Sequence, residues 1–423
     1  MMTNTYVPHV GGVAQSVRRF TEAYRAMGHR VLVVAPEFEG QPEHETDVVR
    51  MPAIQNFNGS DFSVVIPIPL YLRSTLDEFA PDIVHSHHPF LLGTTALKAA
   101  AARRVPLVAT YHTNYEHYTH YVPFGAERLK GFVKELAVGY ANRCDHVIAP
   151  SESVEGLLRE RGVTQRITVI PTGVDIDTFA RGDNAAARER IGIPEDAFVV
   201  GYVGRLAPEK NLEFLAEAAA RTMEQDDKVH LLIVGHGPSR ESIEDVCARG
   251  GVGSRTHFTG SLDDQELIDA YHALDAFAFA SQSETQGMVL IEAMAAGKPV
   301  IALEGPGVRE VMRDGENGRL VTEEDTAAFA EALDWAVQLD RDAWEQVCAH
   351  ARQTAREYST ERCAQATLDL YAAAIEQHAR EAHQRDTDEF DGLLSVIEEE
   401  WRLWVNRLSA AGEIVASPEA QRE

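Results

Sequence analysis

The fold is indicated most clearly by one stretch, which reads Ser283-Glu-Thr-Gln-Gly-Met-Val-Leu-Ile-Glu-Ala-Met-Ala-Ala-Gly-Lys-Pro-Val-Ile-Ala-Leu303. The apolar run just before it, residues 275–281, predicts a buried parallel strand. Residues 288–296 are apolar and rich in helix formers, which predicts a helix. Gly297 then ends this helix and Pro299 begins the next strand. The pattern of strand, loop, helix and strand is typical of a parallel sheet covered by helices.

The same stretch places two carboxylates, Glu284 and Glu292, around the loop that opens the helix. The first N–H groups of a helix are free and lie at its positive end, so this loop suits a phosphate. Glu292 follows about a turn and a half into the helix, and its side chain leans back toward the N-terminus. Two acids that flank a phosphate site can accept hydrogen bonds from hydroxyls, which describes a nucleotide sugar. Taken alone, this spacing more often belongs to an ordinary helix with two solvated glutamates.

The length and composition predict a globular protein of two domains, because the chain has 423 residues of which 44% are hydrophobic. The four cysteines are scattered and form neither a disulfide framework nor a zinc spacing. No apolar run has the length of a membrane span, and the first residues have no signal-peptide pattern. We therefore expect a cytoplasmic protein.

The net charge of −27 is concentrated in the second half of the chain. Up to Gly182 there are 17 basic and 19 acidic residues, whereas the remainder has 22 and 47. The first part is thus nearly neutral and the second strongly acidic, which argues against nucleic acid as a partner.

Short apolar runs alternate with helix-length spacers along the chain, which predicts an α/β protein with two doubly wound, Rossmann-like domains that face each other across a cleft. The expected domains are 1–182, 183–365 and a C-terminal helical segment 366–423 that returns to the N-terminal domain. The predicted strands are 29–36, 82–87, 106–112, 146–151 and 167–172 in the first domain, and 198–205, 230–237, 256–260, 276–281 and 299–303 in the second.

Three connecting regions allow more than one interpretation. The segment Pro171–Phe179, followed by a polar, loop-like stretch 181–190, predicts a hinge; Asp175 and Asp177 suit either a turn or a metal site. Residues 1–5 lead directly into a glycine loop, as if most of a first strand were missing and the true start lay upstream. Near the other end, Trp401 and Trp404 lie on a predicted helix that packs on the body, forms a dimer contact or seats on a membrane.

Several segments at strand ends could bind a diphosphate. Gly11 and Gly12 precede an amphipathic helix, where the backbone can approach an anion. Arg205 ends a predicted strand and Lys210 follows shortly after, although both could simply be solvated. Histidines crowd the other predicted cleft edge: His85, His87, His88, His112, His117 and His120.

The histidines do not predict a metal site, because no carboxylate or cysteine joins them at a ligand spacing. His112, at a strand end, could hydrogen-bond a sugar hydroxyl or a phosphate as a neutral imidazole, or could simply be buried or solvated.

In this order, the segments resemble the retaining glycosyltransferases of family 4, which have the GT-B fold. The resemblance covers the chain up to about residue 371 and rests on Gly11-Gly-Val13, Tyr111-His112, Pro171-Thr-Gly-Val-Asp175, Gly204-Arg205, Pro208-Glu-Lys210, Val234-Gly-His-Gly-Pro238 and the Glu284 to Glu292 stretch. It implies transfer from a nucleotide sugar with retention of configuration, without a metal or other cofactor.

The resemblance also implies a role for each matching residue. The diphosphate would be held by Gly11, Gly12, Arg205 and Lys210, and the donor sugar by Glu284 with the amides of Gln286, Gly287 and Met288 nearby. Glu292 would bind the ribose, and His112 would contact the sugar near the reacting centre. We expect the base to be read by backbone groups around residues 258–261.

Within that family, residues 110–123 look like those of members that glucosylate diacylglycerol. The stretch 126–143 then carries Arg128, Lys130, Lys134 and Arg143 on a predicted amphipathic helix, which either packs on its own sheet or seats the domain on anionic lipid at the inner face of the membrane. We therefore expect transfer of glucose from UDP-glucose to a lipid. A soluble sugar or sugar phosphate acceptor, a GT-B nucleotide-sugar epimerase and a catalytically silent binding protein are the alternatives.

Overall fold

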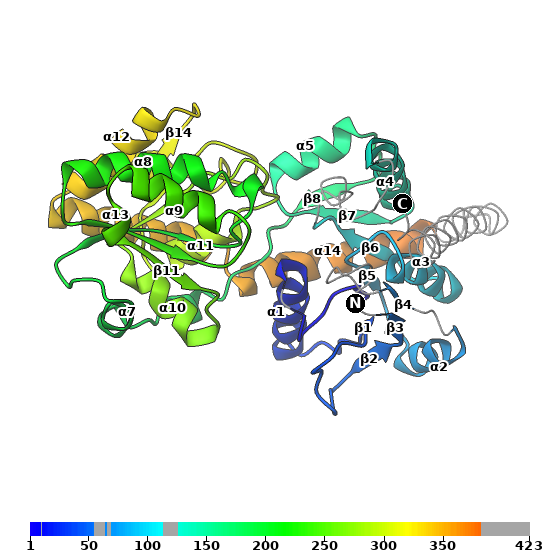
Figure 1. Cartoon of the computed structure of the whole chain (residues 1–423). Coiled ribbons are helices and arrows are strands. Elements are labelled where there is room, and N and C mark those ends of the chain that lie inside the picture. The colour runs from blue at the N-terminus through cyan, green and yellow to red at the C-terminus, as the bar shows by residue number, and fades with distance from the viewer. Residues whose placement is uncertain (10, 55–63, 66–68, 113–125, 382–423) are drawn as a thin grey trace, which may run out of the picture. The chain divides into compact units, whose positions relative to one another are not determined.

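The computed structural model describes residues 1–9, 11–54, 64–65, 69–112 and 126–381 (Figure 1). Residues Met1–Ile375 form one compact unit. The predicted helix with Trp401 and Trp404, and the segment 113–125 with His117 and His120, lie outside the described residues.

The N-terminal sheet is parallel and consists of β1 (Val33–Pro36), β2 (Val48–Met51), β5 (Val84–Ser86), β6 (Leu107–Thr110), β7 (His146–Ala149) and β8 (Ile167–Val169). Met2 makes parallel bridges to Val34 of β1 and Ser86 of β5, so the first residues lie between these strands. The strand order is therefore β2-β1-Met2-β5-β6-β7-β8. A short antiparallel pair, β3 (Ala53–Ile54) and β4 (Val64–Val65), stands apart from this sheet.

Helices of this half follow the strands as the sequence predicts. They are α1 (Gly12–Ala26), α2 (Pro69–Phe79), α3 (Leu92–Arg103), α4 (Ala126–Ala141) and α5 (Glu152–Glu160). α1 is amphipathic and buries Val17, Phe20 and Tyr24. α5 begins at Ser151, whose hydroxyl accepts a hydrogen bond from the N–H of Val154 and so satisfies one of the free donors of the first turn.

The C-terminal sheet is also parallel and has the order β11-β10-β9-β12-β13-β14. Its first strand, β9, therefore lies in the middle, and the order reverses between β9 and β12, as in a dinucleotide-binding fold. The strands are β9 (Phe198–Val203), β10 (Val229–Val234), β11 (Thr256–Gly260), β12 (Ala276–Phe279), β13 (Val300–Leu303) and β14 (Gly318–Val321).

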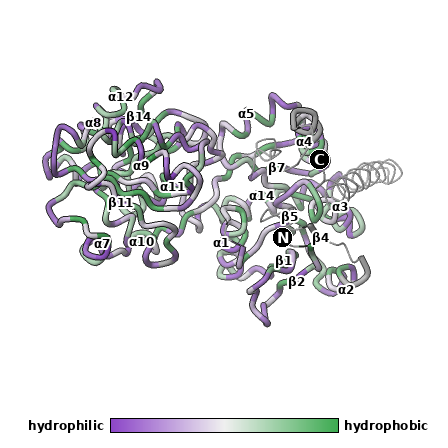
Figure 2. Tube along the Cα trace, viewed as in Figure 1, coloured by the Kyte–Doolittle hydropathy of each residue, from purple (hydrophilic) through white to green (hydrophobic). Residues whose placement is uncertain are grey.

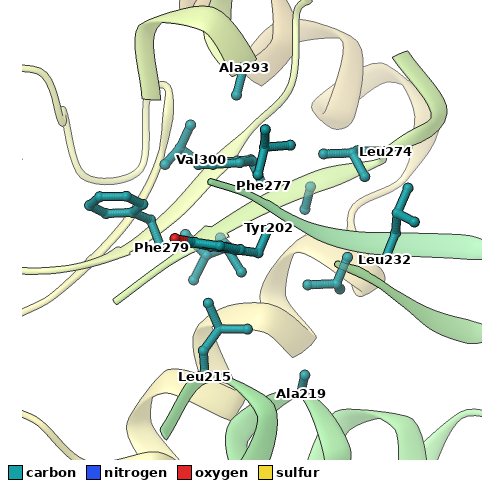
Figure 3. Packing of buried hydrophobic residues seen from close by; sticks show 14 of the residues in the cluster. Tyr202, Leu215, Ala219, Leu232, Leu274, Phe277, Phe279, Ala293 and Val300 are labelled. Carbon is teal, nitrogen blue, oxygen red and sulfur yellow. The ribbon is translucent and has the colours of Figure 1, made fainter. Parts of the chain in front are cut away.

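The helices of this half are α6 (Ile176–Phe179), α7 (Asn184–Ile191), α8 (Leu212–Gln225), α9 (Arg240–Arg249), α10 (Asp264–Ala273), α11 (Met288–Ala295), α12 (Thr326–Gln338) and α13 (Arg341–Glu357). Two short 3₁₀ helices, η3 (Pro208–Lys210) and η4 (Gly253–Arg255), complete it. In Figure 3, Leu215 and Ala219 of α8 lie on one side of the strand residues, and Ala293 of α11 lies on the other. The sheet is thus covered on both faces, and in Figure 2 the hydrophobic segments follow its strands.

The last described helix, α14 (Thr360–Glu381), packs on the N-terminal core. Its residues Cys363, Tyr371 and Ala374 belong to the same buried cluster as Val17 and Phe20 of α1. The domain boundaries themselves, 1–182, 183–365 and 366–423, stay a prediction.

The chain crosses between the two sheets at two places, and these are hydrogen-bonded to each other. The N–H of Val174 donates to the carbonyl of Tyr358 at 3.0 Å, and the N–H of Thr360 donates to the carbonyl of Val174 at 3.1 Å. A Cβ on Gly173 would lie 2.4 Å from the Cα of Thr360, so only glycine allows this approach.

One local prediction was wrong, and some strands were missed. The stretch 181–190 is not a loop, because Asp183 caps α7 by accepting a hydrogen bond from the N–H of Ala186, and Gly192 ends that helix in the left-handed region with φ 82°. Strands β2 and β14 were not predicted, since each is short and only partly buried, and therefore lacks a continuous apolar run.

Candidate functional site

The loops after β9 and β12 lie where the strand order of the C-terminal sheet reverses, which is the usual ligand site of such sheets. The loop after β9 carries Arg205 and Lys210, and the loop after β12 carries Glu284 and Gln286. A hydrogen bond joins the two loops, since the hydroxyl of Ser281 donates to the carbonyl of Glu209 at 3.3 Å. The loop with Arg205 and Lys210, predicted to hold the diphosphate, therefore lies next to the loop with Glu284, predicted to hold the sugar.

Glycine allows these loops to pack backbone against backbone. A Cβ on Gly235, just after β10, would lie 1.9 Å from the carbonyl oxygen of Gly204, and the φ of Gly235 is +138°. Gly235 of the Val234-Gly-His-Gly-Pro238 motif therefore has to be a glycine, because its backbone packs closely against the loop that bears Arg205.

Lys210 and Glu284 form an ion pair in which the Nζ–Oε1 distance is 2.5 Å. Both side chains are largely buried, with 18% and 19% of their surfaces exposed. The pair places an ammonium group and a carboxylate from two different loops side by side. A ligand anion could therefore bind the ammonium group while ligand hydroxyls donate hydrogen bonds to the carboxylate.

Arg205 belongs to the same loop as Lys210 and has its own acidic neighbour. Its Nη2 is 2.5 Å from the Oε1 of Glu209, and both side chains are about half exposed. Glu209 was not singled out from the sequence, although it lies next to Lys210. Each cation predicted to hold the diphosphate is thus already in contact with a carboxylate, and an incoming diphosphate has to compete with it.

Glu292 lies on α11 and is also largely buried. Its Oε2 accepts a hydrogen bond from the hydroxyl of Tyr271 at 2.9 Å, and its Oε1 lies 3.7 Å from the Nη2 of Arg19 on α1. Burial raises the pKa of Glu292, whereas Arg19 and Tyr271 lower it in part. Arg19 and Tyr271 therefore help to keep this acceptor ionised and oriented.

The loop between Glu284 and α11 has a well-defined geometry. Gly287 precedes the helix in the left-handed region, with φ 68°, and Met288 is its first residue. The side chain of Gln286 turns toward Thr172 in the segment that joins the two halves of the chain. Its backbone amide can still serve a ligand, as the resemblance implies, but its carboxamide has another role.

In the N-terminal half, the predicted site residues are Gly11, Gly12 and His112. Gly11 precedes α1 in an extended conformation and no side chain caps this helix; Gly12 opens it, and a Cβ there would meet nothing. His112 follows β6, and its Nε2 lies 2.9 Å from the Nδ1 of His87. Burial lowers the pKa of His112 to about 4, so that the imidazole is neutral near pH 7. Within the described part of the chain, no hydrogen bond or ion pair links His112 to the loop with Glu284.

The alternative metal sites receive no support from the described residues. Among these residues, no group of three His, Cys, Asp or Glu side chains could hold a metal ion. Asp175 instead caps α6, accepting from the N–H of Thr178 at 3.0 Å and from its hydroxyl at 2.6 Å. None of the helices in the described ranges is long and apolar enough to cross a membrane.

Besides Glu209, sequence reasoning missed two residues at this site, Arg19 and Tyr271. Arg19 lies in an amphipathic helix in which several polar residues look alike, and Tyr271 is one apolar-face residue of α10. Their contacts with Glu292 join segments far apart in the sequence, so no local pattern could have indicated them.

Comparisons with known proteins agree with this geometry. The model of Glycosyltransferase Family 4 matches residues 10–178, and that of Glycosyl transferases group 1 matches residues 183–358. The chain is 31% identical to the alpha-monoglucosyldiacylglycerol synthase of Streptococcus pneumoniae over 348 residues, which cover 79% of this chain and 77% of that one. It is also 31% identical to the GDP-mannose-dependent alpha-mannosyltransferase of Corynebacterium glutamicum over 386 residues, covering 89% and 88% of the two chains.

Among solved structures, HepE of Anabaena in complex with UDP has a similar fold, with a TM-score of 0.70 and 22% identity over 88% of this chain and 98% of that one. The two parallel sheets, the paired loops at the strand-order reversal and the sequence relatives lead to one conclusion: this chain is a glycosyltransferase of family 4 with the GT-B fold.

Proposed function

We propose that this enzyme transfers a hexose, glucose, from UDP-glucose to a lipid acceptor such as diacylglycerol, with retention of configuration and without a metal ion. The observation that carries the proposal is the Lys210–Glu284 pair at the strand-order reversal of the donor-side sheet. A relative named for monoglucosyldiacylglycerol synthesis and a UDP complex of similar fold support the choice of donor and acceptor.

The residues suggest how the donor would be held. The diphosphate would displace carboxylates from Lys210 and Arg205, and the freed oxygens of Glu284 would accept hydrogen bonds from the sugar. Glu292 would accept hydrogen bonds from the ribose hydroxyls, while the Tyr271 hydroxyl and the Arg19 guanidinium stay beside its carboxylate and orient it. His112, neutral because burial lowers its pKa to about 4, would hydrogen-bond a sugar hydroxyl rather than neutralise the phosphate.

In the proposed reaction, the acceptor hydroxyl attacks the anomeric carbon from the side on which the diphosphate leaves. The new glycosidic C–O bond forms as the bond to the diphosphate breaks, and the acceptor proton passes to the departing phosphate oxygen. Negative charge grows on the leaving group, so Arg205, Lys210 and the amides near Gly287 would stabilise the transition state.

The acceptor side of the proposal rests on α4. Lys134 is exposed on this helix, whereas Ala137 and Tyr140 are buried against the protein. Arg143, just beyond α4, donates to the carbonyl of Gly139 on that helix. We propose that the exposed face of α4 seats the enzyme, as a peripheral protein, on the cytoplasmic face of an anionic membrane.

Vesicle sedimentation tests the membrane proposal. We expect binding to vesicles with anionic lipid, weaker binding after Lys134→Glu, and loss of binding at high salt. The absence of binding to both anionic and neutral vesicles would reject the membrane seat.

The reaction is tested with a panel of UDP- and GDP-sugars and of lipid, sugar and sugar phosphate acceptors, with products identified by mass. GDP-mannose belongs in the panel because a GDP-mannose-dependent relative covers 89% of the chain. We expect a glucosylated lipid from UDP-glucose, an α-linkage in the NMR spectrum, and the same rate with a chelator. Isomerised donor without an acceptor would indicate an epimerase instead, and no turnover of any donor would indicate a binding protein.

A further inference from the structure

The side chain of Gln286 is bound to the backbone of a single residue, Thr172, through both of its polar atoms. Its Oε1 accepts the N–H of Thr172 at 2.6 Å, and its Nε2 donates to the carbonyl of Thr172 at 2.8 Å. Gln286 and Thr172 are 4% and 6% exposed, so water does not replace either bond easily. If either buried residue moved away, the carboxamide of Gln286 and the backbone N–H and carbonyl of Thr172 would lose their hydrogen-bond partners. The two bonds therefore favour one defined position of the Gln286 side chain.

The two residues belong to different parts of the enzyme. Gln286 lies between Glu284 and the first residue of α11, in the loop at the candidate donor site. Thr172 lies in the segment after β8, where the chain leaves the N-terminal sheet, and Arg19 also donates to the next carbonyl, that of Gly173, at 3.3 Å. The carboxamide therefore fastens the donor loop to the connection between the two sheets.

Other contacts hold the same loop. The hydroxyl of Ser151, which caps α5, donates to the carbonyl of Thr285 at 2.7 Å. In addition, a Cβ on Gly307 would lie 2.8 Å from the backbone N of Gln286, so the two backbones pack closely. These contacts hold the backbone at Thr285 and Gln286, whereas the bonds to Thr172 are the ones that the Gln286 side chain makes.

We propose that Gln286 is a positioning residue for glycosyl transfer, whose side chain fixes Glu284 at the donor site by bonding to Thr172. The role of Glu284 toward the donor rests on the proposed function, whereas the bond to Thr172 does not. The neighbouring Gln282 is exposed and bonds instead to Glu324, at 3.0 Å, so the same substitution at that position is a matched control.

The first experiment measures hydrogen exchange and needs no activity. Gln286→Met keeps the length of the side chain but removes both polar atoms. In peptides covering residues 170–174, where Pro171 has no N–H, we expect the Thr172 amide to exchange at least about tenfold faster in Gln286→Met than in Gln282→Met or the wild type. Equal exchange in all three proteins would overturn the proposal, whichever substrates the enzyme uses.

The second experiment measures transfer in a double-mutant cycle with Glu284→Gln, in proteins whose folding is first checked by circular dichroism. Gln286→Met should lower kcat by about 10- to 100-fold in the wild type, with the acceptor KM unchanged, but by less than about twofold when Glu284→Gln is already present. A purely structural role would give the same factor in both backgrounds and so would refute positioning through Glu284. If the wild type itself used no donor in the panel, the proposed function would fail, and the exchange result would still decide whether Gln286 holds Thr172.

Discussion

The ion pair between Lys210 and Glu284 should be energetically coupled, and the coupling can be measured with Lys210→Met, Glu284→Gln and the double variant. The charged atoms are 2.5 Å apart and less than one fifth of each side chain is exposed. At an effective dielectric constant of about 20, two unit charges this close attract by roughly 6 to 7 kcal/mol before desolvation is counted. Desolvation and lost side-chain freedom offset much of this attraction, which leaves a net coupling of about 1 to 2 kcal/mol.

Urea denaturation of the four proteins at pH 7 and low salt gives this coupling energy directly. Each single variant leaves one largely buried charge without its partner, so the double variant should be about as stable as either single one. The exposed pair of Lys228 and Asp196, 3.0 Å apart, is the control, and we expect no measurable coupling there.

The same variants also separate stability from catalysis. Both Lys210→Met and Glu284→Gln should lower kcat/KM by about 10²-fold or more, because each removes a preorganised group at the donor site. A coupling energy below about 0.3 kcal/mol, or near wild-type turnover in both single variants, would refute this assignment of the pair.

Three further outcomes are expected. Arg205→Ala should lower kcat/KM by about 10²-fold or more, because Arg205 would bind the leaving diphosphate, and an unchanged value would remove it from the site. Arg19→Met should raise the pKa of Glu292 further, and so weaken nucleoside diphosphate binding by about tenfold. The loss of affinity should be larger at pH 6 than at pH 8, whereas Arg18→Met, on the exposed side of α1, should cause no loss. Titration calorimetry at both pH values measures these affinities. Burial lowers the pKa of His112 to about 4 and of His88 to about 3, below the value of about 6.5 for an unfolded histidine, so the unfolded state binds more protons between these values. Stability should therefore be full above about pH 6.5 and fall by about 1.4 kcal/mol per pH unit for each histidine as the pH drops; urea midpoints that stay level from pH 7 to 5 would contradict this.

Local patterns were sufficient for the main elements of the fold. Continuous apolar runs predicted β9, β10 and β12 close to their observed bounds, because strands buried on both faces need no polar positions. The same reasoning failed for β14, which is only partly buried, and for α7, where a capping aspartate was taken as part of a loop. A short segment is thus predicted reliably only where burial leaves a continuous apolar run, since a capping aspartate also fits a loop.

The sequence by itself determined that two parallel sheets carry glycine loops, cations and acids at strand ends, because strand and helix periodicity and turn chemistry are local properties. Only the tertiary structure decided the partners of those residues: Lys210 with Glu284, Arg19 and Tyr271 with Glu292, and Gln286 with Thr172. Such partners are selected by the path of the whole chain. A buried polar atom bonds to whatever donor or acceptor the packing brings within about 3 Å, and the order of residues along the chain does not encode that distance.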